Sequence, residues 1–82
     1  MYRLDIDPEA RDQINAVPAR ELKLLAEVFA MLELTPWNGQ PQHKDNPDGE
    51  VRRVLFGDWG IVTYLILEDQ QRVDVLQVVW AG

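Results

Sequence analysis

The stretch EVRRVLFGDWGIVTYLILEDQQRVDVLQVVWAG, residues 50–82, decides the fold because it contains three strand-like segments separated by short turns. The segments are residues 51–56, residues 59–67 and residues 72–80. Each is rich in β-branched and aromatic residues, and Gly57-Asp58 and residues 68–71 supply the turns. The middle segment is apolar on both faces, so we expect it to be central in the sheet. It should be covered on both sides, or on one side by another chain.

The residues before this stretch predict one strand and two helices. Residues 2–6 alternate between apolar and polar side chains, which indicates a half-buried strand. Asp7-Pro8-Glu9 then starts a helix, with the aspartate as N-cap, the proline at the first helical position and the glutamate near the positive end of the helix dipole. Pro18 ends this helix, and a second helix is predicted over residues 19–34.

The second helix has a wide apolar surface, made of a main stripe and an adjoining face. The stripe consists of Leu22, Leu25, Phe29 and Leu32, and the adjoining face of Leu24, Val28 and Met31. A surface this wide predicts contact with the sheet and with another element. Core packing alone explains it, and a groove for a partner is the alternative.

A long loop, residues 35–49 (TPWNGQPQHKDNPDG), connects the second helix to the sheet. It is dense in Pro, Asn, Gly and Asp, which form turns for different backbone reasons. Loops of this length are uncommon in compact domains and are often functional. We expect Trp37 to anchor the loop on the core.

Length and charge narrow the function. The 82 residues form one domain, residues 1–82, and the chain has no cysteine for a disulfide, a thiolate ligand or a nucleophile. No apolar stretch approaches the roughly 18 residues that span a bilayer, so we expect a soluble, cytoplasmic protein without a membrane partner. The net charge of -6 disfavours nucleic acid and favours a basic protein segment as partner.

Together these segments predict an α+β fold of order β-α-α-β-β-β, an antiparallel sheet with both helices on one face. This order resembles the RelE/ParE toxin superfamily over nearly the whole chain. The resemblance is carried by Asp7-Pro8-Glu9-Ala10, by Pro36 after the second helix and above all by residues 51–59 (VRRVLFGDW). The apolar segments 61–67 and 73–79 extend it.

The resemblance implies a toxin-like component of a toxin–antitoxin system. Members of the RelE branch are ribosome-dependent endoribonucleases, those of the ParE branch poison DNA gyrase, and an antitoxin wraps both. The chain would then act by protein contact or by weakened, ribosome-dependent cleavage of mRNA, with an antitoxin-like protein as partner. The alternative is a non-catalytic binding or dimerisation module on the same scaffold, for which a second copy of the chain is a further partner.

The resemblance places one candidate site residue: Arg53 falls where the family has a basic residue on this strand. If the chain cleaves RNA, we expect Arg53 and Arg52 to hold phosphate, Trp59 to stack a base and His43, the only histidine, to transfer a proton. Gly60 and Leu55 stand where the family commonly has basic residues. The basic cluster that the family carries after its last strand has no counterpart before Gly82.

Plainer readings remain for these residues. Arg52 and Arg53 point to opposite faces of a strand, and either can form a solvated salt bridge, for example with Asp74. His43 lies in a loop without an evident partner. The acidic residues near the N-terminus have no ligand-loop spacing, so neither a metal nor a cofactor is predicted.

Overall fold

The computed structural model describes residues 1–82 and shows two helices and one five-stranded sheet. The strands are β1 (Arg3–Ile6), β2 (Gln40–Pro41), β3 (Val51–Phe56), β4 (Gly60–Leu67) and β5 (Arg72–Trp80). The helices are α1 (Pro8–Ile14) and α2 (Ala19–Leu34), and two 3-10 turns are η1 (Pro36–Asn38) and η2 (Glu68–Gln70). The α+β class and the order β-α-α-β-β-β are confirmed; the two-residue strand β2 inside the long loop is an addition.

The sheet is mixed rather than purely antiparallel. Its strand order is β1-β5-β4-β3-β2, and only β1 runs parallel to its neighbour, with Leu4 opposite Val73 and Ile6 opposite Val75. Two parallel strands need a long connection between them. Both helices, the loop and the strands β3 and β4 lie between β1 and β5 in the chain, so β1 can pair in parallel with the outer edge of β5.

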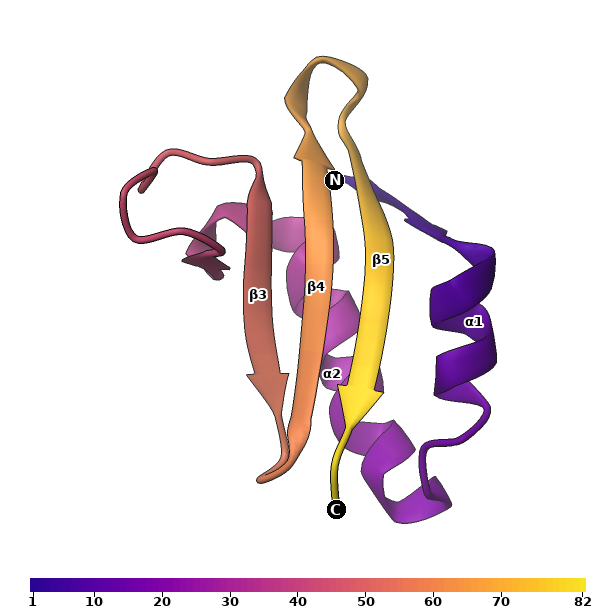
Figure 1. Cartoon of the computed structure of the whole chain (residues 1–82). Coiled ribbons are helices and arrows are strands. Elements are labelled where there is room, and N and C mark those ends of the chain that lie inside the picture. The colour runs from indigo at the N-terminus through magenta and orange to yellow at the C-terminus, as the bar shows by residue number, and fades with distance from the viewer.

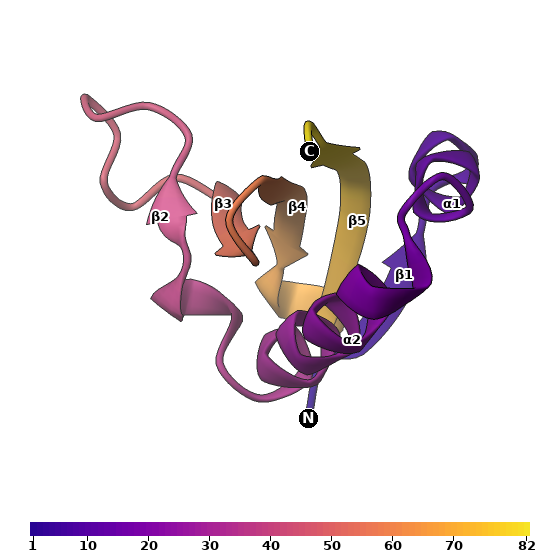
Figure 2. The same ribbon diagram turned by 90° about the horizontal axis from the view of Figure 1, so that it is seen from below.

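The two helices take different positions on the sheet. α2 crosses one face, whereas α1 lies beside β5, beyond the end of β1 (Figures 1 and 2). There the side-chain Oε1 of Gln13 accepts a hydrogen bond of 2.6 Å from the backbone N of Val78. The helix thus bonds to the part of the β5 edge that β1 does not reach. The expectation that both helices cover one face is therefore met by α2 alone. Neither helix is long and apolar enough to cross a membrane.

Helix starts follow the sequence only in part. Asp7 occupies the N-cap of α1, but its side chain makes no capping hydrogen bond. Its backbone N donates to the O of Val75 at 3.0 Å, which continues the pairing of β1 with β5. Its backbone O accepts a hydrogen bond of 2.9 Å from the N of Arg11, so the backbone of Asp7 links the sheet to the first turn of α1.

The core lies between the helices and the sheet, mainly under α2, and includes the fully buried Ala10 of α1. Its fully buried side chains include Leu25 and Leu32 of α2, Val62, Tyr64 and Ile66 of β4, and Val73 and Val75 of β5. From the predicted stripe of α2, Leu22 is exposed and Phe29 is only partly buried. The residues of β4 alternate between buried and half-buried, so the chain itself covers only one face of its central strand.

Candidate functional site

The face of the sheet opposite α2, which we call the open face, has no helix over it (Figure 2). Strand register places its residues in rows across β3, β4 and β5. One row consists of Leu55, Ile61 and Val79, and the next of Arg53, Thr63 and Gln77. The open face thus has an apolar band near the β3–β4 turn and a polar band in its middle.

Much of the apolar band is exposed to solvent. Leu55 is 70% exposed and Val79 40% exposed, and Trp59, in the adjacent turn, is 62% exposed. Large apolar side chains that gather on one exposed surface are typical of interaction sites. The sequence pointed to this surface, because it predicted a central strand that is apolar on both faces.

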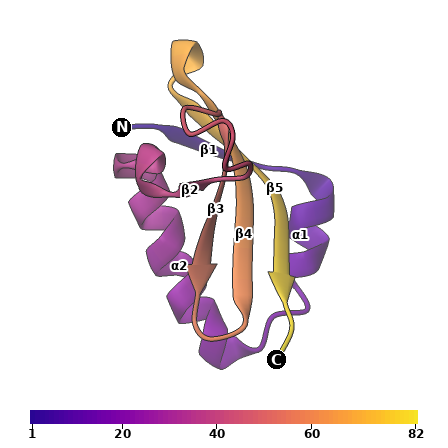
Figure 3. The ribbon, with the colours of Figure 1, turned by 60° about the vertical axis from the view of Figure 1, so that its left-hand side comes forward.

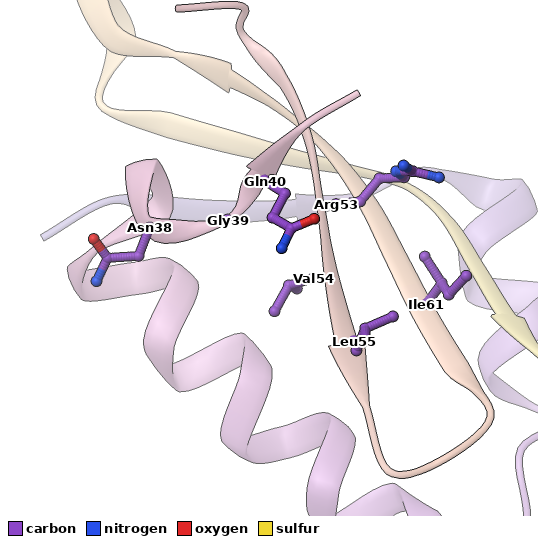
Figure 4. A pocket seen from close by; sticks show the side chains of 7 residues that line it. All are labelled: Asn38, Gly39, Gln40, Arg53, Val54, Leu55 and Ile61. Atoms are coloured by element: carbon purple, nitrogen blue, oxygen red, sulfur yellow. The ribbon is translucent and has the colours of Figure 1, made fainter. Parts of the chain in front are cut away.

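Arg53 lies in the polar band and is exposed. The single salt bridge of the chain joins Arg72 to Asp74 at 2.8 Å, so Arg53 is not paired with an acid. It lines a hollow of about 430 Å³ together with Asn38, Gln40 and Leu55 (Figure 4). Arg53 and Leu55 lie on one side of β3 in this view, and Val54 lies on the other.

Arg52 has a structural position that excludes the role proposed for it from the sequence. The residue is only 7% exposed, and four N–H groups of its guanidinium are donated to loop carbonyls. The acceptors are the O atoms of Gly49 (3.0 Å), Trp37 (3.1 Å), Gly39 (2.9 Å) and Pro47 (2.7 Å). Because the guanidinium holds both ends of the long loop, it is not free to bind a phosphate.

Tyr64 is the second anchor of this loop. Its hydroxyl donates to the O of Pro36 at 2.6 Å, and burial raises the pKa of the phenol above its usual range. A Cβ at Gly39 would lie 1.8 Å from this hydroxyl, so only glycine allows the loop to pass so close. No local pattern predicts this contact, because Tyr64 and Pro36 are far apart in the chain.

Trp37, which we expected to anchor the loop on the core, helps to hold the loop through contacts at the surface. Its ring lies 4.9 Å from the guanidinium carbon of Arg52, and the side chain is 37% exposed. Its indole Nε1 donates to the Oε1 of Glu68 at 2.7 Å, and the hydroxyl of Tyr2 donates to the same oxygen at 2.6 Å. These bonds lower the pKa of Glu68, and the bond to Glu68 raises the pKa of Tyr2.

The four candidate residues do not form one site. The backbone N of Gln42 bonds to Val51, which places the adjacent His43 at the start of β3, whereas Trp59 follows the end of that strand. Figure 3 shows the loop and the β3–β4 turn at opposite ends of the sheet. Five steps along a strand separate two ends by about 17 Å. His43 and Trp59 therefore cannot act on one reacting group together with Arg53.

No group of three or more His, Cys, Asp or Glu side chains is placed to hold a metal ion. The only histidine lies on the exposed loop, and the acidic residues near the N-terminus do not converge.

Comparison with solved structures identifies the architecture. The chain superposes on the intact RelBE toxin–antitoxin complex of Escherichia coli with a TM-score of 0.82 at 14% identity, covering 100% of this chain and 99% of the matched chain. A RelBE toxin–antitoxin complex from Mycobacterium tuberculosis gives 0.81 at 21% identity, covering 98% and 91%. The archaeal RelE–RelB complex from Pyrococcus horikoshii gives 0.68 at 14% identity, covering 99% and 96%. The chain has a RelE-like fold.

At the level of sequence the same chain stands apart. No protein-family model matches it, and a comparison with curated proteins gives no significant match.

Gly60 illustrates how this RelE-like chain departs from the basic pattern. A Cβ at this buried position would lie 2.4 Å from the ring of Phe56, which fills the space that a side chain would need. An arginine at position 60 is therefore incompatible with Phe56 in its present place. Leu55, the other position where a basic residue was expected from the resemblance, presents an apolar side chain on the open face.

Proposed function

We propose that this chain is the toxin-like component of a toxin–antitoxin pair and that it acts through protein contact on its open face. The observation that carries the proposal is the full-length RelE-like fold combined with the exposed apolar band of Leu55, Ile61 and Val79. The solved structures with this fold include RelE toxins bound to RelB-type antitoxins. An antitoxin-like protein is accordingly the proposed partner.

Charge supports contact with protein over contact with RNA. The chain has a net charge of -6, and in the two rows across the open face Arg53 is the one cation. Binding to a phosphate backbone grows with the number of cations that displace counterions, so a single arginine supplies little. An apolar band instead gains free energy when a protein surface removes it from water.

Weakened cleavage of mRNA on the ribosome is the second candidate. One feature favours it: Arg53 is exposed, unpaired and set in a hollow with the polar side chains of Asn38 and Gln40. A guanidinium in that position can hold a phosphate and stabilise negative charge that develops on it. Arg53 is then the phosphate-binding residue, and neither Trp59 nor His43 lies beside it.

Induced expression of three proteins in a bacterial host separates the candidates: the wild type, Arg53→Ala and Leu55→Asp. Growth is scored together with primer extension on translated mRNA. Protein contact predicts growth arrest that Leu55→Asp abolishes and Arg53→Ala retains, without new cleavage sites. Cleavage that disappears in Arg53→Ala would overturn protein contact and establish the second candidate.

Normal growth would have a different meaning. If the wild type accumulates as folded protein and growth is unaffected, the toxin proposal fails and a non-catalytic module remains. Size-exclusion chromatography of the wild type and of Leu55→Asp then shows whether the open face joins two copies of the chain. A dimer that Leu55→Asp converts to a monomer would identify the second copy as partner.

A further inference from the structure

We propose that the outer edge of β3, next to the hairpin turn, binds a short extended segment of a partner protein that carries a basic residue followed by alternating apolar residues. The inference rests on the proposed function only in that it treats this chain as one that binds protein. The edge of β3 adjoins the open face and shares Leu55 and Ile61 with it, but the contacts proposed here are made mainly by the backbone of β3 and the hollow toward α2. Three features of the edge support it: backbone groups without a partner strand, one hollow on each side of the edge, and unpaired carboxylates close to it.

The backbone of Leu55 has no strand beside it. The bond from the N of Ile66 to the O of Glu50 (2.9 Å) fixes which residues of the β3 segment pair with β4. By alternation, the groups of Val51, Arg53 and Leu55 point outward. Gln40 of β2 pairs with Arg53, and the backbone N of Gln42 bonds to the O of Val51. The residues before Gln40 belong to η1 and do not extend this pairing to Leu55.

Two hollows flank this free edge. The outer hollow, about 430 Å³, lies between β2 and β3 and is lined by Gln40, Leu55 and Ile61 among others (Figure 4). The helix-side hollow, about 270 Å³, lies between α2 and β3 and is lined by Leu24, Val28, Met31 and Phe56. Side chains of an added strand alternate between the two faces of a sheet. The residue opposite Leu55 would enter the outer hollow, and its neighbours would enter the helix-side hollow.

The chemistry of the hollows defines the segment. The helix-side hollow is mostly apolar, which calls for large apolar residues at alternate positions. Glu27 also lines it, and the buried Oε2 of Glu21 has no hydrogen-bond partner; a Cβ at Gly57 would lie 2.7 Å from that oxygen. The chain's one salt bridge involves neither glutamate. An unpaired carboxylate beside Gly57 and a second one in the same hollow thus favour a lysine or arginine near Gly57.

Direction follows from the strand that the segment extends. β2 is antiparallel to β3, and a segment placed in line with it would be antiparallel as well. β3 runs toward Gly57, so the segment would begin at Gly57 and end near Gly39. The basic residue is therefore N-terminal to the apolar ones. The free edge is short, so the occupant pairs over only a few residues.

The test starts with a displayed library of random 12-residue peptides, selected on the intact protein. The expected result is a consensus with a basic residue followed by two or three large apolar residues at alternate positions. A consensus without alternation, a basic residue C-terminal to the apolar ones, or no enrichment over an unrelated acidic protein would each overturn the proposal.

Hydrogen exchange then locates the selected peptide. The amide of Leu55 points outward and exchanges freely in the unbound chain, so bound peptide should slow its exchange about tenfold or more. The amides of α1 should be unaffected. Binding that leaves the Leu55 amide unprotected would place the peptide elsewhere and contradict the assignment.

Matched variants complete the test. Leu55→Pro removes the outward N–H, whereas Leu55→Ala keeps it; the proline should weaken the peptide about tenfold more than the alanine. If Leu55→Pro does not fold, Glu27→Gln gives the same answer, since it should weaken the basic peptide severalfold, with Glu9→Gln on α1 as the neutral control. Equal binding by Glu27→Gln and the control would contradict the charge argument. Because these readouts need no growth arrest, they stand or fall separately from the toxin proposal.

Discussion

The covered face and the open face of this sheet differ in what satisfies their side chains. On the covered face, Arg52 is buried with four loop carbonyls around it, and Leu32 of α2 is fully buried. On the open face, the adjacent Arg53 is unpaired and Leu55 is 70% exposed. Similar residues thus stabilise the fold on one face and remain available to a partner on the other.

The largest expected effect contrasts two leucines. Leu32→Ala should lower the free energy of unfolding by about 2–5 kcal/mol, because it removes buried methyl groups and leaves a cavity. Leu55→Ala should change it by no more than about 0.5 kcal/mol, because the side chain is exposed. Urea denaturation followed by tryptophan fluorescence measures both values.

A large loss of unfolding free energy in Leu55→Ala would contradict the difference between the two faces. It would mean that the open face is already covered in the free protein, for which the obvious cover is a second copy. The wild-type midpoint would then rise with protein concentration, as it does for a dimer. A midpoint independent of concentration, with a stable Leu55→Ala, would confirm that the face is free.

The two arginines should give the next largest difference. Arg52→Ala should cost about 2–3 kcal/mol, since it removes a charged donor from four carbonyls and releases the loop. Arg53→Ala should stay within about 0.5 kcal/mol. Arg52→Lys should recover little, because a lysine lacks the planar fork that reaches several acceptors.

Loop mobility gives a second measurement for the same pair. Amide exchange in residues 42–49 should accelerate in Arg52→Ala and stay unchanged in Arg53→Ala. Unchanged exchange in both variants would contradict the assignment of Arg52 to the loop and would return it to the candidates for a binding role.

Much of the secondary structure could be predicted from the sequence. Local patterns predicted the second helix over residues 19–34 and the strands 51–56 and 72–80 with the bounds that the structure has. Alternation also predicted that Arg52 and Arg53 point to opposite faces. It did not tell which face is buried, because Val54, Leu55 and Phe56 are apolar on both sides of the strand.

What the sequence missed depends on contacts between distant segments. The parallel pairing of β1 with β5, the position of α1 beside β5 and the bond from Tyr64 to Pro36 all join residues far apart in the chain. The loop carbonyls that bind Arg52 have no side-chain signature at all. Arg53 was proposed from a resemblance in order and spacing and the other candidates from residue type and position, and the structure does not bring the four residues together.

An arginine substitution at Gly60 or at Thr63 should give a smaller difference in stability between the two faces of β4. Gly60→Arg should destabilise the chain by about 1–3 kcal/mol, because its Cβ would meet the buried ring of Phe56. Thr63→Arg, on the open face beside Arg53, should change stability by about 0.5 kcal/mol or less. Thermal unfolding of both variants tests this. A stable Gly60→Arg would show that Phe56 yields, and the absence of an arginine there would lose its structural explanation.

The smallest expected effect is a pH dependence of the contacts around Glu68, which tie the start of the loop to the turn after β4. The hydrogen bonds from Tyr2 and Trp37 lower the pKa of Glu68 below its ordinary value of 4.5. A lowered pKa means that the ionised form is favoured in the folded state. The stabilisation is therefore fully present above pH 4.5 and is lost as the pH falls through the lower, folded value.

NMR titration of two side chains in this cluster, Trp37 and Tyr2, tests the pH dependence at its acidic and basic ends. The indole N–H of Trp37 should shift on acidification with a midpoint below 4.5, and Glu68→Gln should abolish the shift. Tyr2 should behave inversely: its bond to Glu68 raises the pKa of the phenol above 10.0, so its contribution persists below that pH and is lost as the pH rises through the folded value. In Glu68→Gln the phenol should return toward its ordinary pKa. If both midpoints stay unchanged in Glu68→Gln, the carboxylate does not join these segments, and Arg52 and Tyr64 alone hold the loop.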